Sequence, residues 1–127
     1  MSVYVPDATI DAMLDVIADD VTKLHICSTQ PTNYTEANAT YELGNVTVTS
    51  GVGGGDWTQT DGDTSGRKIT MAEQTGINID TTGTALHIAG TNGTDTLYFV
   101  TTVTSQGVNS GNTATINTFD IEVQDAS

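Results

Sequence analysis

The dipeptide Asn92-Gly93 stands between two apolar runs, and it limits the fold of this chain more than any other feature of the sequence. Asn-Gly flanked by alternating apolar residues is typical of a two-residue type I′ turn, which joins two antiparallel strands. Such a turn pairs Thr91 with Thr94 and sets the register of both strands. The apolar face predicted for this hairpin contains Leu86, Ile88, Leu97 and Phe99.

Most of the remaining chain repeats this pattern of short alternating stretches and turn residues. Only 6% of residues are aromatic, and 13 glycines lie among many Thr, Asn and Ser residues. β-Branched Thr suits a half-exposed pleated surface, whereas Gly and Asn suit tight turns. The last stretch alternates strictly, with Phe119, Ile121 and Val123 on one face. We therefore expect a mainly β fold, a β-sandwich or flattened barrel of about 7–9 antiparallel strands.

One amphipathic helix is expected at the N-terminus, over 7–21, because Asp7 can cap it and apolar residues recur every three or four positions. The residues expected to pack on the sheets are Ile10, Met13, Leu14 and Ile17. Carboxylates recur every four residues along the same helix, and we expect them to face solvent. They are Asp7, Asp11, Asp15 and Asp19. A single domain is expected over 1–127, with its β domain over 23–125.

The charge excludes several classes of partner. The formal net charge is −13, with three Lys or Arg residues against 16 Asp or Glu residues. Phosphate backbones and anionic membranes repel such a surface, so neither nucleic acid nor membrane is an expected partner. No apolar run approaches the length of a spanning helix. A partner with basic patches is favoured instead.

Cys27 is the one cysteine, which excludes an intramolecular disulfide framework and a multi-cysteine zinc site. The N-terminal sequence lacks the basic start and apolar core of a secretion signal, so we expect synthesis in a cytoplasm without export by the Sec route.

The stretch DGDTSGRK, residues 61–68, resembles the first half of a calcium-binding loop. Asp61, Asp63 and Ser65 occupy the first three ligand positions, but Ala72 stands where a bidentate Glu is needed. These three residues are therefore weak metal candidates, and no cofactor is expected. A polar turn with positive φ at Gly66 is the favoured interpretation. Arg67 is then expected to neutralise Asp61 or Asp63, or to pair with a partner.

Catalytic patterns are not visible. His25 and Cys27 share one face of a predicted strand, but a Cys-His dyad also needs convergent geometry and an orienting group. His87 opposite Tyr98 is ordinary packing on a sheet face. Trp57 could stack on a sugar, although a single Trp is more often a core or interface anchor. We therefore expect a protein that is not an enzyme.

Several segments follow an expected amphipathic N-terminal helix in a fixed order. They are LHICSTQPTNYTEA, DGDTSGRKIT, GTALHIA and TLYFVTTVTSQGVNSGNTATINTFDIEVQD. In these segments and their order, nearly the whole chain resembles small structural proteins of tailed-bacteriophage virions, and most of all a head decoration, or cement, protein. The resemblance implies a virion location on the outer capsid surface, with the major capsid protein as partner. It transfers no residue role.

The residues expected to meet that partner combine exposed apolar side chains, one cation and part of the acidic helix. They are Val52, Trp57, Val108, Asp11, Asp15, Asp19 and Arg67. Self-association on the shell is a further expectation. Two alternatives stay open at this point: a tail or baseplate subunit, and a calcium-assisted glycan-binding module that uses Asp61, Asp63 and Trp57.

Overall fold

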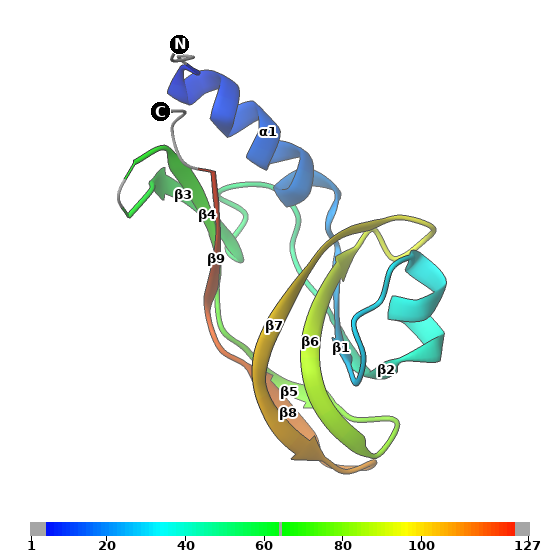
Figure 1. Ribbon diagram of the computed structural model, residues 1–127. Helices are drawn as coiled ribbons and strands as arrows, with labels where there is room; N and C mark the ends of the chain where they lie inside the picture. The colour runs from blue at the N-terminus through cyan, green and yellow to red at the C-terminus, as the bar shows by residue number, and fades with distance from the viewer. Residues whose placement is uncertain (1–4, 64, 124–127) are drawn as a thin grey trace. The chain divides into compact units, whose positions relative to one another are not determined.

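The computed structural model describes residues 5–63 and 65–123 (Figure 1). This part of the chain contains one α-helix, one short π-helix and nine strands in three antiparallel sheets. In chain order, the elements are α1 (Asp7–Asp20), β1 (Lys23–Cys27), η1 (Glu36–Thr40), β2 (Glu42–Thr47), β3 (Trp57–Asp61), β4 (Arg67–Met71), β5 (Gln74–Asn78), β6 (Gly83–Thr91), β7 (Leu97–Val108), β8 (Thr113–Ile116) and β9 (Phe119–Val123). The fold is mainly β with one N-terminal helix, as predicted. The end of the expected β domain, Gln124 and Asp125, lies outside the described residues.

These elements form two compact units, and each unit is assembled from separated stretches of the chain. The helix unit contains α1, β3, β4 and β9, and the sheet unit contains η1 and the other six strands. The chain passes between the units after residues 20, 48, 73 and 116. The expectation of a single domain over 1–127 stays a prediction.

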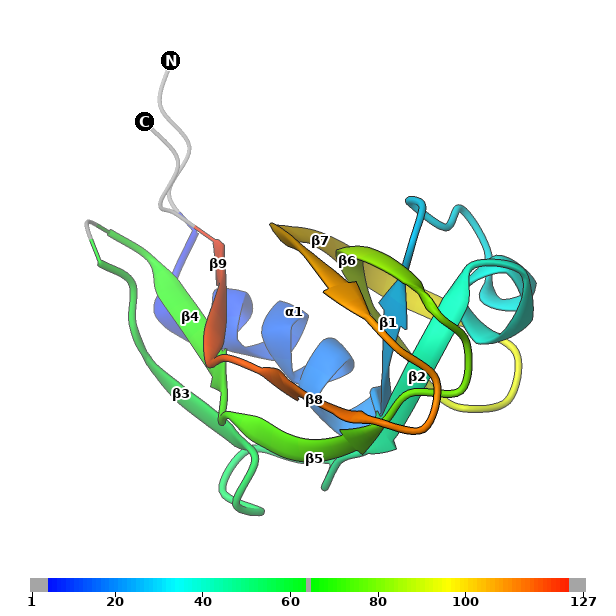
Figure 2. The same cartoon turned by 90° about the horizontal axis from the view of Figure 1, so that it is seen from below.

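The sheet unit is built on a four-stranded sheet of order β2-β1-β6-β7, in which β6 and β7 are strongly curved (Figure 2). Strands β5 and β8 form a separate ribbon, which a bridge between Ile79 and Gly44 joins to the β2 strand. A Cβ on Gly44 would lie 2.5 Å from the carbonyl oxygen of Asn78, so this approach requires glycine. On one face of the large sheet, Cys27 and Ala89 pack with Ala37 of η1.

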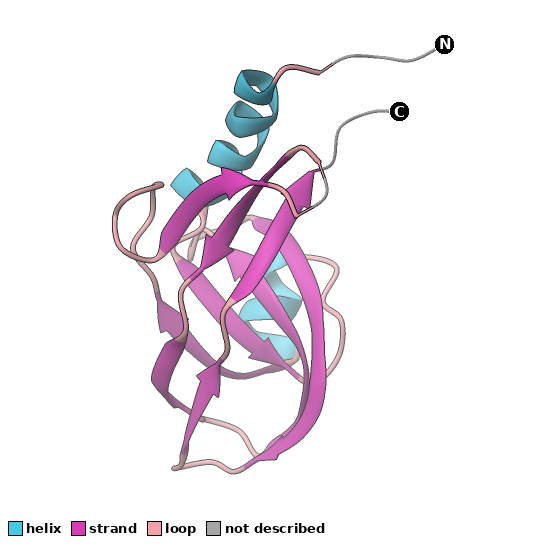
Figure 3. Cartoon of the chain, turned by 90° about the vertical axis from the view of Figure 1, so that its left-hand side faces the viewer, coloured by secondary structure: helices cyan, strands magenta, loops and turns pink. Residues whose placement is uncertain are grey.

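In the helix unit, α1 packs on a three-stranded sheet of order β3-β4-β9 (Figure 3). The register aligns Trp57 with Met71 and Met71 with Phe119. The Trp57 side chain is fully buried, and its ring meets that of Phe119 edge to face, with centroids 6.4 Å apart. The buried residues of the helix are Ile10, Leu14 and Ala18.

The hairpin between β6 and β7 has a longer loop than predicted. Thr91 pairs with Leu97, so residues 92–96 form the loop. Gly93 has a φ of 73°, but no non-glycine residue among those described has positive φ, and a type I′ turn requires it at both central positions. Instead, the Asn92 side-chain oxygen accepts hydrogen bonds from the backbone N–H groups of Thr94, Asp95 and Thr96. The side chain thus closes a wider turn.

The predicted apolar face of this hairpin is therefore wrong. Phe99 pairs with Gly90, and its ring fills the space that a Cβ at position 90 would need. Ile88 pairs with Thr101. Of the four residues expected to be buried together, only Ile88 is buried, and Leu86, Leu97 and Phe99 are half-buried.

Candidate functional site

The turn at 61–68 is closed by the backbone and joins β3 to β4. The N–H of Gly62 donates to the carbonyl oxygen of Gly66 at 2.9 Å. Gly66 has a φ of 73°, as predicted for a turn residue at this position. Asp61 and Arg67 are the last paired residues of the two strands, so the turn places carboxylates and cations side by side.

Both cations of this turn are bound by two carboxylates. The Arg67 Nε lies 2.7 Å from Asp11 Oδ1, and its Nη1 lies 2.6 Å from Asp61 Oδ1. The Lys68 Nζ lies 2.7 Å from Asp63 Oδ1 and 3.3 Å from Asp120 Oδ2. Hydrogen bonds, to Asp11 for Arg67 and to Asp63 for Lys68, are the main reason that the pKa of each cation is raised. Arg67 therefore neutralises Asp61, one of the two residues proposed for it.

The weak metal candidates lie in this network. Asp61 and Asp63 each place a carboxylate oxygen on a cation of the same hairpin, which fits the turn interpretation. Ser65 lies in the same turn. In the described part of the chain, no group of three or more His, Cys, Asp or Glu side chains is placed to hold a metal ion.

The acidic side chains of α1 differ from the expected solvated stripe. Asp11 and Asp15 are half-buried, and Asp15 Oδ1 accepts a hydrogen bond from Gln59 Nε2 at 3.2 Å. Asp11 binds Arg67, so these two carboxylates face the β3-β4 hairpin. Asp19 is exposed. Of the acidic residues expected to meet a partner, only Asp19 is open to one.

The other expected contact residues divide in the same way. Trp57 has no exposed surface and Val108 is 8% exposed, so neither side chain offers an area to a partner or a sugar. Arg67 is half-buried and bound by two carboxylates. Val52 is 40% exposed, in a Gly-rich loop whose Gly51 N–H donates to the Ala18 carbonyl oxygen at the end of α1.

His25 has a hydrogen-bond network that the sequence did not reveal. Its Nδ1 lies 2.9 Å from Glu42 Oε1, and its Nε2 lies 2.8 Å from Thr91 Oγ1. The connectivity is that of a hydroxyl, an imidazole and a carboxylate in a hydrolase. His25 and Thr91 are, however, completely buried, and Thr91 Oγ1 also accepts the N–H of Gly93. The network links β1 to β2 and to the C-terminal end of β6. Because the Thr91 side chain is buried, its hydroxyl is not accessible to a substrate.

Cys27, on the same face of β1, is a buried free thiol. Burial, and secondarily the nearby Glu42 carboxylate, raise the pKa of its thiol to about 12. Because the thiolate is the reactive form, Cys27 is inert at neutral pH.

His87 does not pair with Tyr98, in contrast to the prediction. It lies opposite Thr102 and next to Cys27 of β1. Its Nδ1 is buried without a hydrogen-bond partner among the described residues. The shift of register explains the change of neighbour.

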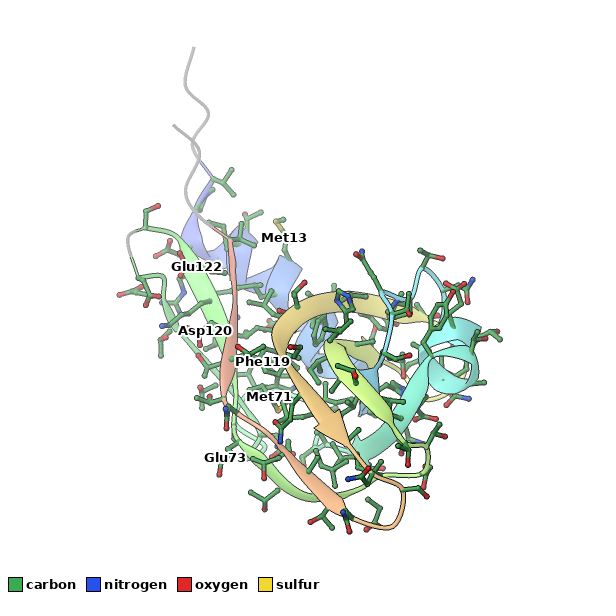
Figure 4. The ribbon with its side chains drawn as sticks, turned by 60° about the horizontal axis from the view of Figure 1, so that its bottom comes forward. Met13, Met71, Glu73, Phe119, Asp120 and Glu122 are labelled. Carbon is green, nitrogen blue, oxygen red and sulfur yellow. The ribbon has the colours of Figure 1, made fainter. Side chains whose placement is uncertain are left out.

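The outer face of α1 was not predicted. Met13, assigned from the sequence to the packed face, is 53% exposed (Figure 4). Val16, one turn further on, is also 53% exposed. The sequence did contain a signal for this exposed face, because the apolar residues of α1 extend over two sides of the helix.

Comparison with protein-family models, with curated proteins and with solved structures found no match to this chain. None of the helices in the described residues is long and apolar enough to cross a membrane. The function is therefore inferred from the chain's own residues.

Proposed function

We propose that this chain is a structural protein of a tailed-bacteriophage virion, a decoration protein that binds the outside of the capsid shell and stabilises it. The partner is the major capsid protein. The observation that carries the proposal is the distribution of charge: Arg67 and Lys68 use their cations inside the helix unit, while most carboxylates stay at the surface.

The effect of this distribution is an exterior that is almost purely acidic. Besides the carboxylates that these two cations bind, exposed carboxylates occur in both units, at Asp7, Asp19, Asp20, Glu73, Asp80 and Asp95. Such a surface attracts a basic partner and accelerates encounter with it. Attraction to a basic partner suits a protein that coats a shell in many copies.

Binding to shells tests the proposal directly. Purified protein is added to capsids that lack it, at several salt concentrations, and bound protein is measured after sedimentation. We expect saturable binding whose association rate falls with added salt. Mass spectrometry of separated heads and tails gives the second measurement, with the protein expected in heads. Absence from capsids at every salt concentration, together with presence in tails, would move the protein to the tail or baseplate.

A further inference from the structure

The outer face of α1 is apolar along most of its length. We define it as the exposed residues Ala8, Thr9, Ala12, Met13 and Val16. Met13 and Val16 are each 53% exposed and lie three positions apart, so their side chains are neighbours on the helix surface. The described chain has three exposed large hydrophobic residues, and two of them are on this face.

This face is separate from the one that holds the helix in its unit. The inner face consists of Ile10, Leu14 and Ala18, all of which are buried. Asp11 and Asp15 mark one edge of the helix by their bonds to the β3-β4 hairpin. The helix is thus apolar on two sides, although only one side is needed to pack it.

Carboxylates stand at the C-terminal end of the outer face. Asp19 and Asp20 are exposed in the last turn, and this turn has no basic residue. The C-terminal end of a helix carries a partial negative charge, so acidic residues there are destabilising and cations are favourable. A cation supplied from outside the chain would relieve this repulsion.

We propose that the outer face of α1 is the surface through which this protein docks on its partner. The partner is a protein surface with an apolar groove for Met13 and Val16, and with Lys or Arg side chains beside the exposed Asp19. This is the helix-in-groove mode of recognition, in which anchors three to four residues apart enter one groove. The inference rests on the proposed function, since the capsid protein is the partner.

Charge favours such a partner over the other occupants of an apolar face. Two copies of this chain joined through α1 would bring acidic residues together, in a protein with a net charge of −13. An anionic lipid surface would meet the same repulsion. A surface with basic residues at the edge of its groove has neither problem.

The test measures binding to capsids that lack the protein, and it compares a double variant on the helix with a single variant outside it. Met13→Gln with Val16→Gln removes the apolar anchors and keeps good helix-forming residues. Val52→Gln tests the rival contact, because it makes the same change at the exposed hydrophobic residue outside the helix, which the sequence also placed among the contact residues. We expect the helix variant to bind about tenfold more weakly or worse, as for loss of interface anchors. Val52→Gln should bind like the wild type, and the melting temperatures of both should be unchanged.

The outcomes separate the inference from the proposed function. If the wild type binds and the helix variant binds equally well, the docking face is wrong and the function stands. If Val52→Gln alone loses binding, the Gly-rich loop is the contact. If the wild type does not bind capsids, the function fails and the docking face fails with it. A wild-type dimer in light scattering that the helix variant abolishes, or a large loss of stability in that variant, would mean that another copy or another part of the same chain covers the face.

Discussion

The helix unit and the sheet unit use polar side chains in opposite ways. In the helix unit, Arg67 and Lys68 each bridge two carboxylates at the surface. In the sheet unit, the imidazole of His25 is completely buried between Glu42 and Thr91. Exposed ion pairs contribute little and are screened by salt, whereas a buried hydrogen-bond network is costly to break. The polar contacts that stabilise this chain most are therefore expected in the buried network of the sheet unit, and not in the helix unit, where the ion pairs lie.

The largest expected effect tests whether the two units unfold separately. Trp57→Ala leaves a cavity in the helix unit and should cost about 3–5 kcal/mol. Because neither unit is a continuous stretch of chain, we expect one transition, detected equally by far-UV circular dichroism and by labelling of Cys27 in the sheet unit. Thr58→Ala, at an exposed neighbour, is the control. Two separate transitions would contradict the expected single domain.

His25→Leu should have the next largest effect, because it leaves Glu42 and Thr91 without their buried partner. A loss of about 1–3 kcal/mol is expected in the free energy of unfolding, measured by urea titration. Glu42→Gln is the matched control, since an amide oxygen can still accept the imidazole hydrogen. An equal loss in both variants would show that the charge of Glu42, and not the hydrogen bond, stabilises the sheet unit.

Gly90→Ala tests the observed register of the β6-β7 hairpin. The new Cβ would collide with the ring of Phe99, so we expect a loss of about 1–3 kcal/mol from overpacking. In the predicted register, this ring would lie elsewhere. Gly90→Ala should therefore cost less stability in the Phe99→Ala background than in the wild type. Strict additivity of the two changes would argue against the contact.

The smallest effect concerns acid stability of the helix unit. A hydrogen bond from the Thr70 hydroxyl, and secondarily the Lys68 ammonium, hold the pKa of Asp120 below its ordinary 3.8. A lowered pKa in the folded state stabilises it above the ordinary pKa, and this contribution is lost as pH falls through the lowered value. Thr70→Val should thus lower the melting temperature slightly at pH 7 and less below pH 3.8. Thr58→Val, the same change at the residue paired with Thr70, should show no such pH dependence.

The fold class and the individual strands could be predicted because alternation and turn residues are local signals. The strict pattern at 119–123 corresponds to β9, and Gly66 has the positive φ expected of the turn. The register of the β6-β7 hairpin could not be predicted, because the Asn92 side chain competes with the backbone for the same N–H groups. The π-helix at Glu36–Thr40 could not be predicted, because five residues contain too little periodicity to recognise.

The polar site was predictable only in part. The ion pair of Arg67 with Asp61 was predictable, because the two residues lie on either side of one turn. Its second partner, Asp11, is distant in sequence, and so are the contacts of His25 with Glu42 and Thr91. Met13 was assigned to the wrong face of α1 because composition does not say how much of a helix the sheet covers. These contacts depend on tertiary packing, which no local pattern encodes.

The four passages of the chain between the units have a consequence for how this protein can change during evolution. A unit made from one continuous stretch can move between genes as a cassette, and it can be duplicated or exchanged by recombination. Here, a crossover after residue 48 or 73 would divide both units, and a crossover after residue 20 or 116 would divide the helix unit. Variation is therefore expected to accumulate by substitution and by insertions at exposed turns, such as residues 109–112, with the order of the segments retained.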